Sequence, residues 1–227
     1  MLDTFIFVFL PYTALALLIG VTPYRYLTNR LTWTTYSTQF LERDTLYWGI
    51  TSWHHGIILI LLAHLAGIVW PQGMQRLLGN QQTLVVLESI GLGLGLLALF
   101  GCLVLLLRRV NSGMLGRVTF AADWVLLYLL IFQAASGIYV AIFMRWGSVW
   151  YLHTAVPYLH SLLLFRPQIE YVADFPLVFK LHAALAFLIV ALLPFTKLVH
   201  LLFLPCRFLA DPPILYRWLG KGGVGRD

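Results

Sequence analysis

The sequence is poor in charged residues and in cysteine. Charged side chains make up 11% of its 227 residues and hydrophobic ones 60%, whereas a soluble domain averages about 25% charged and 45–50% apolar. This shortage of charge excludes an ordinary soluble domain. The two cysteines, Cys102 and Cys206, are far apart and form no C-x-x-C pair, which argues against an iron–sulfur cluster or a structural zinc site carried by this chain alone.

Acidic residues are fewer than basic ones, which leaves a formal net charge of +6. A basic balance can indicate nucleic-acid binding, but in so apolar a chain the Lys/Arg enrichment of cytoplasmic membrane loops explains it more simply. We therefore expect membrane lipid as a partner and no nucleic acid. The sequence has no internal repeat or low-complexity tract, and we interpret residues 1–227 as a single membrane domain.

The chain is rich in long apolar runs. A helix needs about 20 apolar residues to cross the hydrocarbon core, and lipid offers no partner to an unpaired backbone group. The sequence therefore predicts an all-α bundle of five transmembrane helices. These spans cover roughly 3–23, 47–70, 83–107, 123–144 and 176–204. The aromatic connection 145–175 is expected to be a folded loop or an interfacial helix.

The basic residues predict the orientation of this bundle, because cytoplasmic ends of membrane helices are enriched in Lys and Arg. One set of ends holds eleven of the fifteen Lys/Arg, namely Arg25, Arg30, Arg43, Arg108, Arg109, Arg117, Lys197, Arg207, Arg217, Lys221 and Arg226. The other holds Arg76, Arg145, Arg166 and Lys180. We expect the N-terminus outside and the C-terminus in the cytoplasm.

Histidines are placed within these apolar runs. The segment WHHGIILILLAH contains His54, His55 and His64, while His182 and His200 lie in the fifth run. An ionisable residue inside a membrane span indicates function by default. A neutral histidine that hydrogen-bonds between helices is the ordinary alternative for any one of them.

Helix geometry arranges four of these histidines in two pairs. In a continuous helix, His182 and His200 are 18 residues apart, hence five full turns and about 27 Å along one face. His54 and His64 are about 15 Å apart along the axis and about 80° apart in direction. Because spans two and five are antiparallel, His54 is level with His200 near the inner side. His64 is then level with His182 toward the outer side.

Facing imidazoles on neighbouring helices suit axial ligation of a haem iron, and two histidines fill both axial positions, so such a haem transfers electrons. Zinc would want three or four ligands at one point, and a proton relay needs no matched depths. The geometry favours two haems over both alternatives. His55 points about 100° away from His54 and is interpreted as a helix-contact residue.

Several motifs resemble the gamma subunit, a membrane cytochrome b, of respiratory nitrate reductases. They are PY at Pro11–Tyr12, YRY at 24–26, TW…S.QFLE across 32–42, WHHG…AHLAGI, FKLH at 179–182 and LPFTKLVH at 193–200. The resemblance covers most of the chain, and the histidine spacings of 10 and 18 match the family's haem ligands.

The resemblance implies two b-type haems, an outer one held by His64 and His182 and an inner one held by His54 and His200. It implies quinol oxidation near the outer haem, with electrons passing to the inner haem and then to an iron–sulfur subunit. That subunit and a molybdenum-containing catalytic subunit lie on the cytoplasmic side. The implied location is a bacterial or archaeal cytoplasmic membrane.

Two positions depart from the family pattern. Its members carry a lysine near the start of the third span, where this chain reads QQTLVVLESIGLG and has Glu88 as its only ionisable group. Glu88 and His64 are therefore the candidates for the quinol site. The family tends to have arginine where this chain has Lys197, which lacks the guanidinium fork but can still pair with a haem propionate.

The remaining features have ordinary and functional interpretations. Arg108 and Arg109 are topology anchors or propionate contacts, and His153 and His160 are expected at the outer surface. Gly91, Gly93, Gly95 and Gly101 form a stripe of small residues that indicates close helix packing.

Other functions stay open on the sequence alone. The same type of subunit can anchor a sulfur-compound or heterodisulfide reductase, or a nitrite-oxidising complex. A protein of a different class, a transporter with histidines in its pathway, would also place them within spans.

Overall fold

The computed structural model describes residues 1–28, 44–144 and 147–202, and this part of the chain is helical. The motif at 32–42, Arg145 and the basic segment after Cys206 lie outside the described residues. Five helical segments are long and apolar enough to cross a membrane: Leu2–Thr28, Thr45–Val69, Gln81–Asn111, Ala121–Phe143 and Leu177–Phe195. The prediction of five long apolar helices is thus confirmed in the described residues, although the fifth ends earlier than expected.

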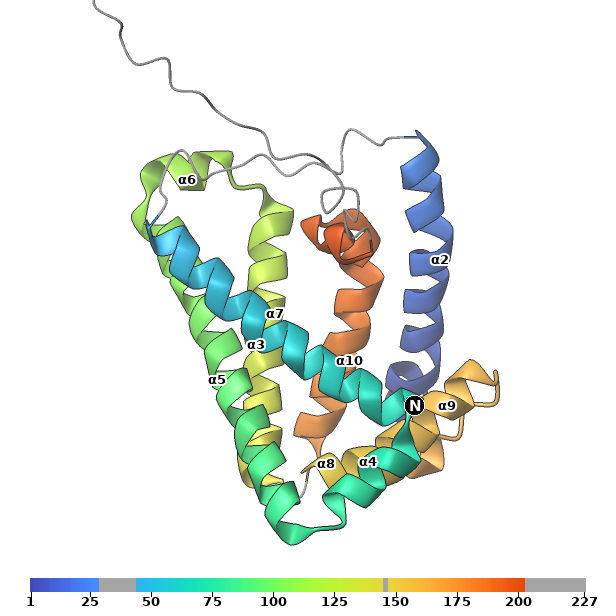
Figure 1. Cartoon of the computed structure of the whole chain (residues 1–227). Helices are drawn as coiled ribbons and strands as arrows, with labels where there is room; N and C mark the ends of the chain where they lie inside the picture. The colour runs from blue at the N-terminus through green and yellow to red at the C-terminus, as the bar shows by residue number, and fades with distance from the viewer. Residues whose placement is uncertain (29–43, 145–146, 203–227) are drawn as a thin grey trace, which may run out of the picture.

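The first span comprises α1 (Leu2–Thr4), the π-helix η1 (Phe5–Phe9) and α2 (Leu10–Thr28). The others are built on α3 (Asp44–Val69), α5 (Gln81–Asn111), α7 (Ala121–Phe143) and α10 (Leu177–Leu192). Helices α2, α5, α7 and α10 run roughly along the long direction of the bundle, and α3 crosses it obliquely (Figure 1). Only 11–22% of the most apolar window of each span is buried inside the protein. The apolar side chains that remain exposed suit contact with lipid tails.

One end of the bundle carries a layer of short helices, seen at the lower end of Figure 1. It contains α4 (Pro71–Leu78), α8 (Gly147–Trp150), η3 (Tyr151–Ala155), α9 (Val156–Leu163) and η4 (Ile169–Tyr171). The predicted folding of the 145–175 connection is therefore confirmed within the described residues. The opposite end carries α6 (Gly113–Val118), with the 3₁₀ segments η5 (Leu193–Phe195) and η6 (Lys197–Leu201) after α10.

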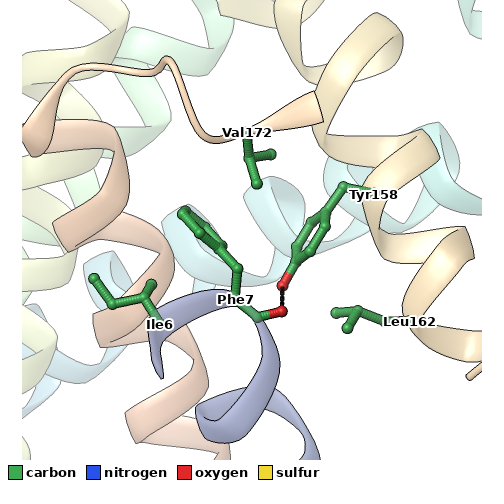
Figure 2. Close-up of a cluster of buried hydrophobic side chains, with 5 residues drawn as sticks. All are labelled: Ile6, Phe7, Tyr158, Leu162 and Val172. Atoms are coloured by element: carbon green, nitrogen blue, oxygen red, sulfur yellow. Dashed lines mark hydrogen bonds between the residues drawn. The ribbon is translucent and has the colours of Figure 1, made fainter. Parts of the chain in front are cut away.

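A buried cluster ties this layer to the first span (Figure 2). It consists of Ile6, Phe7, Tyr158, Leu162 and Val172. Pro11 has no N–H, so the carbonyl of Phe7 lacks its usual helical donor four residues on. The Tyr158 hydroxyl donates to that carbonyl instead, at 2.7 Å. A backbone group that would otherwise be unpaired in an apolar setting is thereby satisfied.

Helices α3 and α5 pack closely, because two glycines let their backbones approach. A Cβ on Gly56 would lie 2.7 Å from the carbonyl oxygen of Leu94, and one on Gly101 would lie 2.5 Å from the backbone nitrogen of Trp53. The predicted packing role of the glycine stripe is thus confirmed at Gly101. It was wrong for Gly91 and Gly93, where an added Cβ would meet nothing within 4 Å.

Replacing Gly56 with alanine is expected to destabilise the protein by about 1–3 kcal/mol, because the new methyl group would meet backbone atoms that cannot rotate away. Gly91→Ala is the matched control, because its Cβ enters open space and alanine is the better helix former. Thermal inactivation of the detergent-solubilised protein would measure both. Equal behaviour of the two variants would contradict the close approach of α3 and α5.

Candidate cofactor site

His54 and His200 lie side by side near the end of the bundle that carries α6. His54 is on α3 and His200 is on η6. Their ring centroids are 6.2 Å apart, with an interplanar angle of 48°. Two metal–imidazole bonds of about 2.0–2.1 Å each, the length known for zinc, plus the inner halves of two rings span about 6 Å. The separation therefore suits one metal ion between two imidazoles.

The fifth span does not continue as one helix to His200. The prediction of a helix over 176–204 was wrong, since α10 ends at Leu192 and the chain continues as η5, an extended Thr196 and η6. Pro194 explains the break, because it has no N–H and its ring clashes with the carbonyl four residues earlier. His182 and His200 therefore do not lie on one face of a continuous helix, and His200 reaches His54 from η6.

Two contacts hold the segment after the break. The Arg25 guanidinium, at the end of α2, donates to the carbonyl oxygen of Pro194. The Lys197 ammonium lies 2.8 Å from Asp123, whose side chain is 8% exposed. Asp123 also accepts a bond from the backbone N–H of Phe120 and so caps α7. The position of η6, and with it His200, thus depends on α2 and α7.

Hydrogen bonds orient three of the predicted ligands on their own segments. The Nδ1 of His54 lies 2.9 Å from the carbonyl oxygen of Ile50, and the Nδ1 of His64 lies 2.8 Å from that of Ile60. His200 makes the same kind of bond to Lys197 at 2.7 Å. A carbonyl can only accept, so Nδ1 carries the hydrogen and Nε2 keeps its lone pair for a metal.

His55 makes the equivalent bond to Thr51 at 2.8 Å, and its side chain is exposed on another face of α3. It is His54, and not His55, whose ring lies against the ring of His200. The structure thus separates the two members of the HH dipeptide by the direction in which they point.

His182 is half-buried against α7, and His64 is within electrostatic range of it. Its Nδ1 lies 2.9 Å from the Oγ of Ser136, and its Nε2 lies 3.3 Å from the amide nitrogen of Gln133. His64 is covered on one side by Tyr151 of η3, whose ring centroid is 5.0 Å away and whose hydroxyl donates to the carbonyl of His64 at 2.8 Å. Burial raises the pKa of Tyr151, which keeps that donor protonated.

Glu88 is bound to the layer of short helices. Its Oε1 accepts bonds from the backbone N–H of Ser148 at 3.2 Å and from the Ser148 hydroxyl at 2.5 Å. The carboxylate thus holds α8 against α5, which is a structural role that the sequence reasoning did not foresee. A pocket of about 490 Å³ opens between α4 and α9, and neither Glu88 nor His64 is among its lining residues.

The predicted propionate contacts gather at the other end. Arg108 is buried, and Arg109 interacts electrostatically with Asp123, the partner of Lys197. Sequence reasoning missed Asp123, although an acidic residue at the start of an apolar helix is a recognisable cap signal. Arg108, Arg109 and Lys197 thus lie at the end of the bundle that carries His200.

The two histidines in the layer of short helices differ in exposure. His153 is exposed, as expected for a surface residue. His160 points inward, where its Nε2 lies 2.9 Å from the carbonyl oxygen of Ile68, and it lines the pocket between α4 and α9. It therefore joins α9 to the end of α3.

The donor chemistry of these residues fits two flat macrocycles with bis-imidazole ligation. Helix α3 packs mainly against α5, and α10 packs mainly against α7 and α2, so the two histidine-bearing helices are each held by other helices. Among the described residues no group of three or more His, Cys, Asp or Glu is arranged to hold a bare metal ion. In the described residues the fold brings histidines together in pairs, as His54 and His200 show.

Comparison with known proteins gives a consistent result. The family model described as nitrate reductase gamma subunit matches residues 3–219. The nitrate reductase gamma chain of Bacillus subtilis is 32% identical over 212 residues, which cover 92% of this chain and 95% of that one. The respiratory nitrate reductase 1 gamma chain of Escherichia coli is 28% identical over 92% of this chain and 94% of that one. A nitrate reductase-like protein, NarX, of Mycobacterium tuberculosis is 28% identical over 91% of this chain and 32% of its own length.

Proposed function

The chain belongs to the nitrate reductase gamma subunit family, and on that premise we propose that it is the membrane subunit that takes electrons from quinol and delivers them to the soluble subunits of a nitrate reductase. The observation that carries the proposal is the His54–His200 pair, with ring centroids 6.2 Å apart and both Nδ1 atoms bonded to carbonyls. Reduction of nitrate itself would occur on a partner.

His54 and His200 would hold one b-type haem, and His64 and His182 a second. When bound, these groups would supply one-electron transfer. Lys197, Arg108 and Arg109, at the end of the bundle that carries His200, would contact the propionates of the inner group. The carbonyl-bonded Nδ1 atoms of His54, His64 and His200 keep these imidazoles in the tautomer that binds iron through Nε2.

The quinol would be oxidised near His64, on the side of the layer of short helices. Glu88 remains a proposed contact of quinol, although its Oε1 already accepts two bonds from Ser148. Tyr151 adds a half-buried phenol ring against the ring of His64. These groups would position the quinol and accept its hydrogen bonds.

We propose the orientation from the charges at the two ends. In the described residues Arg25, Arg108, Arg109 and Lys197 lie at the end with α6, opposite Arg76, Arg166 and Lys180. Basic residues favour the cytoplasmic side, so this end would face the cytoplasm of a bacterium or archaeon. An iron–sulfur subunit and a molybdenum-containing subunit would dock there, next to His200.

A reduced-minus-oxidised absorption spectrum of the purified complex, with the ratio of haem to this chain, tests the proposal. We expect b-type bands and a ratio of two. Absence of any b-type band would overturn it and favour a transporter. If the bands are present, the identity of the co-purifying catalytic subunit distinguishes nitrate reduction from reduction of sulfur compounds or oxidation of nitrite.

A further inference from the structure

His182 differs from the other predicted ligands in the partner of its Nδ1. His54, His64 and His200 each bond to a backbone carbonyl three or four residues earlier in the chain. His182 instead uses a side chain of another span, the hydroxyl of Ser136 on α7, at 2.9 Å. A carbonyl is present whatever the side chain is, whereas this hydroxyl depends on one residue.

Ser136 can accept a hydrogen bond from His182. Its Oγ also lies 3.0 Å from the carbonyl oxygen of Gln133, which can accept the serine hydrogen. A hydroxyl has one hydrogen and two lone pairs, so Ser136 keeps a lone pair for the Nδ1–H of His182. The hydrogen of a neutral imidazole is on Nδ1 whenever Nε2 binds a metal.

The second nitrogen of the ring faces the same helix. The amide nitrogen of Gln133 lies 3.3 Å from the Nε2 of His182, so this amide must turn away before Nε2 can bind iron. Serine in a helix commonly bonds back to its own helix, but that bond uses only the donor of Ser136 and leaves its contact with His182 to be explained.

Helix α7 is also shaped to receive this ring. A Cβ on Gly137 would lie 3.0 Å from the Cε1 of His182, which is closer than a side chain is normally tolerated. The ring thus lies against the backbone of α7, with Ser136 at one nitrogen. The orientation of the ring therefore depends on a neighbouring span.

We propose that Ser136 is a positioning residue for His182 and tunes the outer haem. This inference rests on the proposed function. A hydrogen bond from Nδ1–H to an acceptor raises the basicity of a metal-bound imidazole. It therefore stabilises the oxidised iron and lowers the reduction potential. Loss of the Ser136 hydroxyl would raise the potential of the outer haem and leave that of the inner haem unchanged.

The test is an optical redox titration of the intact complex in membranes, with the haem ratio measured on the same samples. Ser136→Ala should shift one of the two haem components to a higher potential. It should also weaken retention of that haem by about 10–100-fold, the usual effect of removing such a partner. Ser136→Thr keeps a hydroxyl and should restore both values.

Ser89→Ala is the matched control, because Ser89 lies in α5 and bonds only to the carbonyl of Val85 on its own helix, at 2.7 Å. It should leave both components unchanged. An unchanged potential in Ser136→Ala, or an equal shift of both haems, would overturn the role of Ser136. A wild-type complex without two b-type haems would instead overturn the proposed function.

Discussion

Replacing His54 or His200 with alanine is expected to remove one haem and to leave the other, so that the ratio of haem to chain falls from two to one. The two imidazoles lie 6.2 Å apart between centroids, and a bis-imidazole site cannot hold its iron in the same state after one ligand is lost. The same spectral component should disappear in both variants. Electron delivery to the soluble subunits should stop, because His200 is at the end where they would dock.

Replacing His64 or His182 should remove the other component. If His54→Ala and His64→Ala abolished the same component, the assignment of the pairs would be wrong. His55→Ala is the control closest in sequence, since its exposed ring points to another face of α3. It should retain both haems. Loss of one haem would show that His55, and not His54, is the ligand.

The sequence predicts the number of spans well because apolar length is a strong, local signal. It also predicts that the 145–175 connection is folded. The course of the chain after Leu192 was predicted incorrectly, because the apolar pattern continues through Pro194 and hides the break. His200 nevertheless lies beside His54, since Arg25 and Asp123 hold the segments around it.

Contacts between distant elements are what the sequence could not predict. The bond of Glu88 to Ser148 spans 60 positions, and that of Ser136 to His182 spans 46. No periodicity within one helix encodes such a bond, because it depends on how helices rotate against each other. The same holds for the glycine stripe, where only the approach of α3 shows that Gly101 is packed and Gly91 is not.

The second large effect concerns energy conservation. We expect turnover to build a membrane potential, with protons released outside while electrons go to the cytoplasmic partner. Quinol must lose two protons to become quinone, and the proposed quinol site near His64 is on the outer side. In the described residues the acidic side chains within the spans are paired: Asp3 with Lys180, Glu88 with Ser148 and Asp123 with Lys197. We therefore expect the protons of quinol to leave on the side where it is oxidised.

Vesicles of known orientation, containing the intact complex, would test this with a quinol analogue and the complex's own acceptor. About two protons should appear on the outer side per quinol oxidised, and each electron that crosses works against about 2.3 kcal/mol per 100 mV of potential. An uncoupler should collapse the potential without stopping turnover, and the His54→Ala complex should generate none. Electroneutral turnover, with protons appearing on the cytoplasmic side, would contradict an outer quinol site.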